Sequence, residues 1–356
     1  MVNLDWLAFS VLLVPSSTEK DNHSFTLNEP AGMHLVEFAG TNIYEKRSIL
    51  YNSEWEKILT LLWCPHSKII KAESMLVEVA NKWLYGDLGW VADVLGCVHQ
   101  YTMQCVSRLD ICYDFEMLPN REEIVRGLAH NDLYVAGKRE GSMFHFYDHT
   151  DKVHIMPKCM SWGSKCSNIK WKIYNKYLEI SEFDNANRRI CIKPYIENLW
   201  KINGMEPSKV WRIEVSITPA HKFEYHGERI TFEKVIQRSY FEDMFISLYQ
   251  NRFVIRKNQG HKDKTNDERV YLLGNFGEWD RVFTREPSNS KEIVEYVSVL
   301  RANMSQLDRV EVRDNERMRE SLLRCVSDIV EIGHLKSYFY NTYGQTFEKY
   351  RASFDK

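Results

Sequence analysis

The sequence lacks several patterns that would assign it at once to a class of protein. Its eight cysteines form no C-x-x-C pair and show no zinc-knuckle spacing, which argues against a structural zinc site and favours reduced thiols. Its formal net charge of −2 excludes a chain that is basic throughout, so any nucleic-acid site must be a local patch. It has no internal repeats and no low-complexity segments, which argues against a repeat architecture.

A long apolar segment is also missing. The run 2-VNLDWLAFSVLLVP has no basic leader, carries Asp5 at its start and is too short to cross a bilayer. We therefore expect a strand there, no membrane segment and a cytoplasmic protein. The 356 residues suffice for one large domain or two ordinary ones.

The spacing of apolar residues predicts an α+β fold. Alternation predicts strands over 5–15, 34–40, 43–51, 57–64, 103–115, 142–148, 168–176 and 208–218. Helical spacing predicts helices over 72–86, 88–100, 120–130 and 231–251, and residues 253–270 are expected to form a polar, basic loop. We expect a large, mainly antiparallel twisted sheet flanked by helices in a domain spanning 1–275. A helical module over 276–356 would follow, with helices near 290–307, 315–331 and 333–342.

Three of the predicted strands carry a polar face, because alternate side chains of a strand point to the same side. These faces comprise Arg108, Asp110, Cys112 and Asp114; Lys170, Lys172, Tyr174 and Lys176; and Arg212, Glu214 and Ser216. The opposite face of each strand is apolar. If the three strands lie in one sheet, the apolar faces form the core and the charged residues converge on the other side.

Clustered carboxylates repel one another unless a cation lies between them. We therefore expect Asp110 and Glu214, with Asp114 as a further candidate, to hold a divalent ion. Their oxygen ligands suit Mg²⁺ or Mn²⁺. The alternative is that Arg108–Asp110 and Arg212–Glu214 are ordinary surface ion pairs.

Tyr174 stands between Lys172 and Lys176 in the stretch 172-KIYNK. A free phenol titrates near pH 10, so it attacks a phosphate only if a neighbouring metal ion or ammonium stabilises the phenolate. The two lysines would supply that charge and would also hold phosphate oxygens in the transition state. The alternative is an ordinary packed strand tyrosine.

The segment from Gly163 to Glu179, G-S-K-x-S followed by six residues, Y-N-K and a glutamate three positions later, resembles the active-site segment of the Rep_trans type of rolling-circle replication initiators. The blocks 108-RLDICYD and 211-WRIEV are similar to two further strands of that family, in the same order along the chain. The opening LDWLAFSV is similar to the N-terminal strand of plasmid and phage replication initiation factors. The resemblance covers about the first 220 residues.

The resemblance implies an enzyme that binds double- and single-stranded origin DNA, nicks one strand and rejoins it after one round of replication. Tyr174 would be the nucleophile that forms a 5′-phosphotyrosine intermediate, and Asp110 and Glu214 would bind the metal. Lys176 and Arg212 would contact phosphate. Family members commonly act as dimers and recruit a helicase, so we expect a homodimer and a host helicase partner.

One departure from related enzymes is the absence of any His-x-His pair, which many relaxases and initiators use to hold their metal. His145 and His149 are only weak ligand candidates. The absence argues against the His-x-His type and leaves a carboxylate-held metal. A conjugative relaxase of the same fold, or a DNA-binding replication regulator without chemistry, remains an alternative function.

The remaining basic patch is 252-RFVIRKNQGHKDK. Arg256, Lys257 and Lys262 are candidates for DNA contacts there. Lys172, Arg108 and Arg212 are the candidates for DNA contacts on the polar face. Asn258 and Gln259 carry amide groups that can read base edges. A solvated basic turn is the alternative.

Overall fold

The structure is a computed structural model. It describes residues 1–15, 25–66, 70–137, 143–145, 157–164, 167–183, 189–261, 263–276, 283–285 and single helical residues between 303 and 326. The chain divides into two compact units, Met1–Thr284 and Arg285–Lys356. The helices predicted beyond residue 290 lie almost entirely outside the described residues. They stay predictions, as does the boundary placed between residues 275 and 276.

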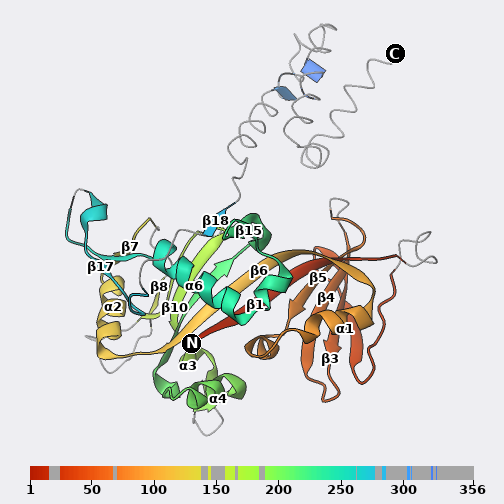
Figure 1. Cartoon of the computed structure of the whole chain (residues 1–356), viewed down its shortest axis with the longest axis horizontal. Coiled ribbons are helices and arrows are strands. Elements are labelled where there is room, and N and C mark those ends of the chain that lie inside the picture. The colour runs from red at the N-terminus through yellow and green to blue at the C-terminus, as the bar shows by residue number, and fades with distance from the viewer. Residues whose placement is uncertain are drawn as a thin grey trace. The chain divides into compact units, whose positions relative to one another are not determined.

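A ten-stranded sheet dominates the described part of the first unit, with the order β2-β3-β4-β5-β1-β6-β13-β10-β9-β8 (Figure 1). All neighbouring strands in it run antiparallel. Its strands are β1 (Val2–Leu13), β2 (His34–Ala39), β3 (Tyr44–Tyr51), β4 (Lys57–Pro65), β5 (Ser74–Val79), β6 (Tyr101–Glu116), β8 (Met143–His145), β9 (Pro157–Trp162), β10 (Ile169–Asn175) and β13 (Val210–Ile217). The fold is α+β with a large antiparallel sheet, as predicted.

The three polar strands are neighbours, because β13 pairs with β6 on one side and with β10 on the other. Arg212 lies opposite Asp114 on β6 and opposite Tyr174 on β10. Glu214 lies opposite Lys172. Residues directly opposite each other in an antiparallel pair share a face. The prediction that these strands bring their charged residues to one side of the sheet is therefore confirmed.

Helices cover the apolar face of the sheet. Figure 1 shows α6 (Arg238–Arg252) across the middle strands and α1 (Trp90–Val98) over β3 to β5. Phe245 on α6 is fully buried and packs against Tyr113 of β6 and Trp171 of β10, with ring centroids 5.8 and 6.3 Å away. Burial of such aromatic rings is a main source of folding free energy, so α6 fixes the strands that carry the polar face.

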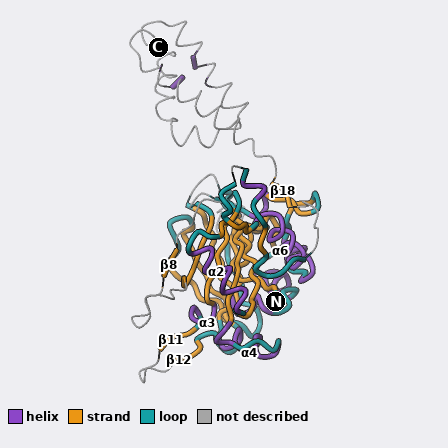
Figure 2. Tube along the Cα trace, turned by 90° about the vertical axis from the view of Figure 1, so that its left-hand side faces the viewer, coloured by secondary structure: helices purple, strands orange, loops and turns teal. Residues whose placement is uncertain are grey.

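The remaining elements lie around the sheet. α2 (Pro119–Ala129) follows β6, and α3 (Lys176–Glu179) follows β10. α4 (Pro194–Ile202) and the hairpin of β11 (Ser181–Phe183) and β12 (Arg189–Cys191) lie next to α3, below the sheet in Figure 2. The short elements are β7 (Leu133–Val135), β14 (Phe223–Tyr225), β15 (Glu228–Arg229), α5 (Phe232–Val235), β16 (Ile255–Lys257), β17 (Arg269–Val270) and β18 (Phe283–Arg285).

Strand β1 contains a bulge at Asp5. Leu4 pairs with Ile111 of β6 and Trp6 pairs with Asp110, so one extra residue is inserted in β1. The insertion resets the alternation of side chains along the strand. Leu4 therefore points into the core, whereas both Asp5 and Trp6 line the polar side of the sheet.

Two predictions of secondary structure were wrong. The helix expected over 72–86 is strand β5 followed by a 3-10 helix, Asn81–Tyr85. Met75, Val77 and Val79 are buried at a period of two, which is strand spacing, and β5 fills the place between β1 and β4. The loop expected over 253–270 contains β16 and β17, which pair with each other.

Two other expectations can be compared with the structure. Cys64, Cys97, Cys105, Cys112, Cys159 and Cys191 are free thiols. Among the described helices, none has the length and apolar character needed to span a bilayer.

Phe245→Ala should lower the free energy of unfolding by roughly 3–5 kcal/mol, because it removes a buried ring and leaves a cavity between α6 and the sheet. Urea denaturation measures this change. The control Ser239→Ala, at an exposed position of the same helix, should change it by less than about 0.5 kcal/mol. Equal stability of the two variants would show that α6 does not anchor the sheet.

Candidate active site

A pocket of about 560 Å³ opens on the polar side of the sheet. Strands β1, β6, β9, β10 and β13 and helix α3 contribute its walls. The lining residues are Asp5, Trp6, Arg108, Asp110, Cys159, Lys172, Tyr174, Asn175, Leu178, Glu179 and Glu214. The pocket therefore gathers the predicted nucleophile and two predicted carboxylates, which come from strands far apart in the sequence.

Tyr174 donates its hydroxyl hydrogen to Oε2 of Glu214 at 2.9 Å. Burial, reinforced by the negative charge of Glu214, raises the pKa of the Tyr174 phenol well above its ordinary value of 10. Burial also raises the pKa of Glu214, with Asp5 adding to the effect and Lys172 opposing it. Stabilisation of the phenolate by the lysines stays a prediction, because these shifts describe the pocket without a substrate. The phenol keeps its proton and already has an acceptor for it.

Lys176 lies beside the phenol although it is not part of the strand. β10 ends at Asn175, whose side chain caps α3 by accepting from the backbone N–H of Leu178 at 2.9 Å. Lys176 then opens the helix, only 1% exposed, with its Nζ 3.5 Å from the Tyr174 hydroxyl and 2.7 Å from Oε2 of Glu179. Burial, together with the positive charge of Arg212, lowers the pKa of Lys176. A positive donor thus lies next to the atom that would attack.

Lys172 is the accessible cation of this group. Its Nζ lies 3.3 Å from Oε1 of Glu214, and its side chain is 44% exposed. The neighbouring Glu214 carboxylate raises the pKa of Lys172, so the ammonium stays charged. It is free to reach a phosphate that enters the pocket.

Arg212 does not have the role that was predicted for it. Its guanidinium is fully buried and donates to both oxygens of Asp114, at 2.5 and 2.8 Å, and to Asp5. Oδ2 of Asp114 also accepts from the indole N–H of Trp200 at 2.8 Å. Arg212 therefore has no access to DNA, and the oxygens of Asp114 are occupied by protein donors. The predicted DNA contact of Arg212 is wrong, and Asp114 is removed from the candidate metal ligands.

Arg108 and Asp110 form the ion pair that the sequence analysis gave as an alternative. Both oxygens of Asp110 accept from Arg108, at 3.1 and 2.5 Å, and Oδ1 also accepts from the Ser216 hydroxyl. The other proposed surface pair, Arg212–Glu214, is absent from the described ion pairs, because Arg212 binds Asp114 and Asp5 instead.

The polar side of the sheet offers a divalent ion two carboxylates. Among the described residues there is no group of three His, Cys, Asp or Glu side chains arranged to hold a metal. Asp110 and Glu214 line one pocket, and each carboxylate has about four lone-pair sites, so the present partners do not exhaust them. Mg²⁺ is often held by one or two carboxylates together with phosphate oxygens. Both oxygens of Asp110 accept from Arg108, however, so an ion would have to share this carboxylate with the guanidinium, and the metal stays a prediction.

The G-S-x-x-S part of the sequence builds the turn between β9 and β10. Gly163 has φ 111°, a conformation that favours glycine, and an added Cβ would lie 3.1 Å from the carbonyl oxygen of Ile169. The backbone N–H of Ser164 donates to the Ser167 hydroxyl at 2.9 Å. These residues position the strand that carries Tyr174, whereas Lys165 lies outside the described residues.

Sequence analysis did not identify Asp5, Trp6 and Tyr85 as site residues. Asp5 accepts from the Tyr85 hydroxyl at 2.9 Å and from Arg212, and it lies 3.8 Å from Nζ of Lys176. Burial alone would raise the pKa of Asp5, but the charges of Arg212 and Lys176 outweigh it and hold the pKa well below its ordinary value. An acid inside an otherwise apolar strand was the signal that could have shown its role.

The basic loop is mostly engaged with its own backbone. Arg256 donates to the carbonyl oxygens of Thr265 and Asp267, and Lys257 lies 2.7 Å from Glu268. Gln259 accepts from the backbone N–H of Glu268. Lys257 is exposed and its DNA contact stays a prediction. Lys262 and His149 lie outside the described residues, as does the side chain of His145.

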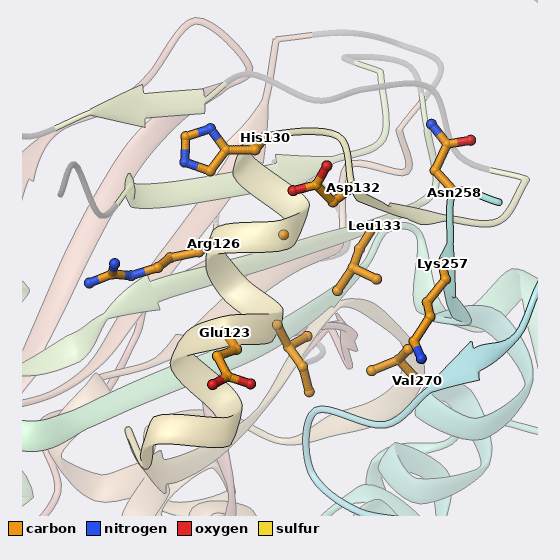
Figure 3. A pocket seen from close by; sticks show the side chains of 10 residues that line it. Glu123, Arg126, His130, Asp132, Leu133, Lys257, Asn258 and Val270 are labelled. Atoms are coloured by element: carbon orange, nitrogen blue, oxygen red, sulfur yellow. The ribbon is translucent and has the colours of Figure 1, made fainter. Parts of the chain in front are cut away.

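A second pocket, of about 660 Å³, lies between α2 and this loop (Figure 3). Leu133 and Val270 face the space between the helix and the strands, whereas the Arg126 side chain points away from them on the other side of α2. It contains no tyrosine and no pair of neighbouring carboxylates from separate strands. We therefore place the chemistry in the pocket of Tyr174.

Comparison with known proteins gives a distant likeness to a solved structure. No protein-family description matches the chain, and no curated protein matches it. A solved structure described as a rolling circle replication initiator protein from Geobacillus stearothermophilus is similar over 76% of this chain and 92% of that chain. The identity is 13% and the TM-score 0.43. Because these values are low, we base the functional conclusion on the geometry of the site and on its residues.

Asp114→Ala should lower the free energy of unfolding by roughly 3–5 kcal/mol, because it leaves the buried Arg212 charge with only Asp5 as a partner. Urea denaturation again provides the measurement. The control Glu122→Ala breaks a pair with Arg126 in which both side chains are more than a third exposed, and should cost about 0.5 kcal/mol or less. If Asp114→Ala is as stable as this control, the buried charge network does not hold the strands together.

Proposed function

We propose that this protein initiates rolling-circle replication by nicking and rejoining one DNA strand through Tyr174. The observation that carries the proposal is the hydrogen bond from the Tyr174 hydroxyl to Glu214, with Lys176 beside the same oxygen, in a pocket large enough for a nucleotide phosphate. A nucleophile bonded to a base is the recurring arrangement of covalent catalysis. The ordered resemblance of three sequence blocks to replication initiators supports the same conclusion.

The reaction is a transesterification. The Tyr174 oxygen attacks the phosphorus and transfers its proton to Glu214, while the bond from phosphorus to the 3′ oxygen breaks. The leaving oxygen takes up a proton from the solvent, and Glu214 releases to the solvent the proton that it accepted. A free 3′ hydroxyl results, and the 5′ phosphate stays on Tyr174. The reverse reaction rejoins the strand, since each step replaces one phosphodiester bond with another.

The two lysines have different tasks in this mechanism. Lys176, held in place by Glu179, stabilises the negative charge that develops on the tyrosine oxygen. Lys172 projects into the pocket and binds a non-bridging phosphate oxygen. Asp110 and Glu214 would hold Mg²⁺ or Mn²⁺, and a bound ion would polarise the phosphoryl oxygen.

The proposed substrate is origin DNA, which the enzyme must bind as a duplex and open to expose a single strand. A homodimer and a helicase partner belong to the same proposal and rest on the resemblance. The direct test is a denaturing gel of the protein mixed with labelled supercoiled DNA of the replicon that encodes it, with Mg²⁺ or Mn²⁺. A label that stays on the protein supports the nicking enzyme, whereas tight binding without any adduct favours a regulator.

Tyr174→Phe should abolish the covalent adduct and leave DNA binding within about twofold, because only the attacking oxygen is lost. Tyr177→Phe is the matched control. Tyr177 lies three residues further along, does not line the pocket and packs against the cluster of Ile180 and Trp200. It should form adduct as the unaltered protein does. Adduct that persists in Tyr174→Phe and disappears in Tyr177→Phe would assign the nucleophile to Tyr177.

Glu214→Gln should slow adduct formation roughly 10²- to 10⁴-fold, the usual contribution of a general base. Only ionised Glu214 accepts the phenol proton, so the rate should rise with pH through the pKa of this group. Burial raises that pKa in the protein without a metal ion.

The rate of adduct formation measured from pH 4 to pH 8 tests this assignment. The increase of this rate with pH should be lost in Glu214→Gln and kept in Asp110→Asn. Asp110→Asn should impair DNA cleavage more than DNA binding. An unchanged increase in Glu214→Gln would mean that another group accepts the proton.

A further inference from the structure

Trp6 and Arg108 form a stacked pair in the wall of the tyrosine pocket. The guanidinium carbon of Arg108 lies 4.4 Å from the centroid of the Trp6 ring. Trp6 is 37% exposed, and the Arg108 side chain is also 37% exposed. Both residues line the same pocket as Tyr174. A partly exposed pair of an indole and a guanidinium therefore lies in the wall of the pocket that also contains Tyr174.

The pair is held rigidly. Trp6 follows the bulge of β1 and lies directly opposite Asp110 on β6. Asp110 binds Arg108 through both of its oxygens and is itself bound by Ser216 on β13. Two hydrogen bonds to one carboxylate fix the plane of a guanidinium. A ligand that stacks there loses little affinity to the ordering of side chains.

The chemistry of the surface selects its ligand. Aromatic rings and arginine planes are the groups on which proteins stack unpaired nucleobases, and the stacking tolerates any base. In a duplex the faces of the bases are covered by their neighbours, so only a single-stranded or extruded base can enter. A single exposed indole is common on protein surfaces. This one is distinguished by its fixed cationic partner and by its place beside the phosphate site.

We propose that the Trp6–Arg108 pair binds an unpaired nucleobase next to the phosphate that enters the tyrosine pocket. The proposal rests on the proposed function for its assignment of DNA to this pocket. It adds a single-strand subsite and a positioning role for Trp6. The base on this stack would set which phosphate lies beside Tyr174.

The test is the affinity of a fluorescein-labelled dT 12-mer for the full chain, measured by anisotropy in EDTA. The Tyr174→Phe background excludes covalent chemistry. Trp6→Ala should weaken binding roughly 5- to 150-fold, the equivalent of the 1–3 kcal/mol typical of one base stacked on an aromatic ring. Trp6→Phe keeps an aromatic face and should retain most of the affinity. Far-UV circular dichroism establishes that each variant is folded.

Two controls separate stacking from other causes. Trp55→Ala removes an indole that is 60% exposed and stacks on His34 in another part of the sheet, and should leave affinity unchanged. A 12-mer with abasic sites keeps the phosphates and removes the bases. This abasic 12-mer should bind weakly to the protein with Trp6, and it should bind to Trp6→Ala with the same affinity.

Equal affinity of Trp6→Ala and the Tyr174→Phe parent for dT would overturn the proposal. It would also be overturned if Trp6→Ala lost the same affinity for the dT and abasic 12-mers. The same holds if Trp55→Ala lost as much affinity for dT as Trp6→Ala. The outcome is independent of nicking. Binding that depends on Trp6 without any adduct on Tyr174 would uphold the base subsite and refute the nicking enzyme. Adduct formation with unaltered binding in Trp6→Ala would refute the subsite alone.

Discussion

The burial of one positive charge constrains the rest of the site. Arg212 on β13 has no contact with water, so its guanidinium must be neutralised inside the protein. Asp114 on β6 and Asp5 on β1 supply the two carboxylates. Three adjacent strands are thereby joined on the side of the sheet that lacks the apolar core. The same charge lowers the pKa of Lys176 and opposes the rise that burial causes in the pKa of Tyr174. Arg212 therefore both joins the strands and affects the pKa values of the pocket residues.

The pocket is polar, but its charges are distributed unevenly. The inner layer, formed by Arg212, Asp114 and Asp5, is satisfied within the protein. The outer layer, formed by Lys172, Glu214 and Tyr174, has partners that a substrate can replace, since Lys172 reaches solvent. Burial makes proton loss from the phenol costly, so the proposed mechanism needs the proton acceptor that Glu214 provides at hydrogen-bond distance.

Strand alternation was sufficient to predict the fold class and the polar face, because Asp110, Tyr174 and Glu214 lie on regular strands. It could not separate residues that face the pocket from those that are buried below it. Arg212 and Glu214 lie on the same face of β13. Only the structure shows that Arg212 is fully buried and paired with Asp114. The helix expected over 72–86 failed because a short valine-rich run fits both periods until its neighbours in the sheet are known.

Asp5 and Trp6 were missed because the alternation rule does not hold across a bulge. Two consecutive residues of β1 serve one pocket, the first as part of the inner charge layer and the second as an exposed surface. The extra residue therefore acts as a phase shift in the strand. Deleting Asp5 would do more than remove a carboxylate. The pairs Leu4–Ile111 and Trp6–Asp110 would then follow each other without a bulge, so β1 would become a regular strand with only Trp6 on this part of the pocket wall. The length of this strand, as much as its composition, therefore decides which of its side chains line the pocket.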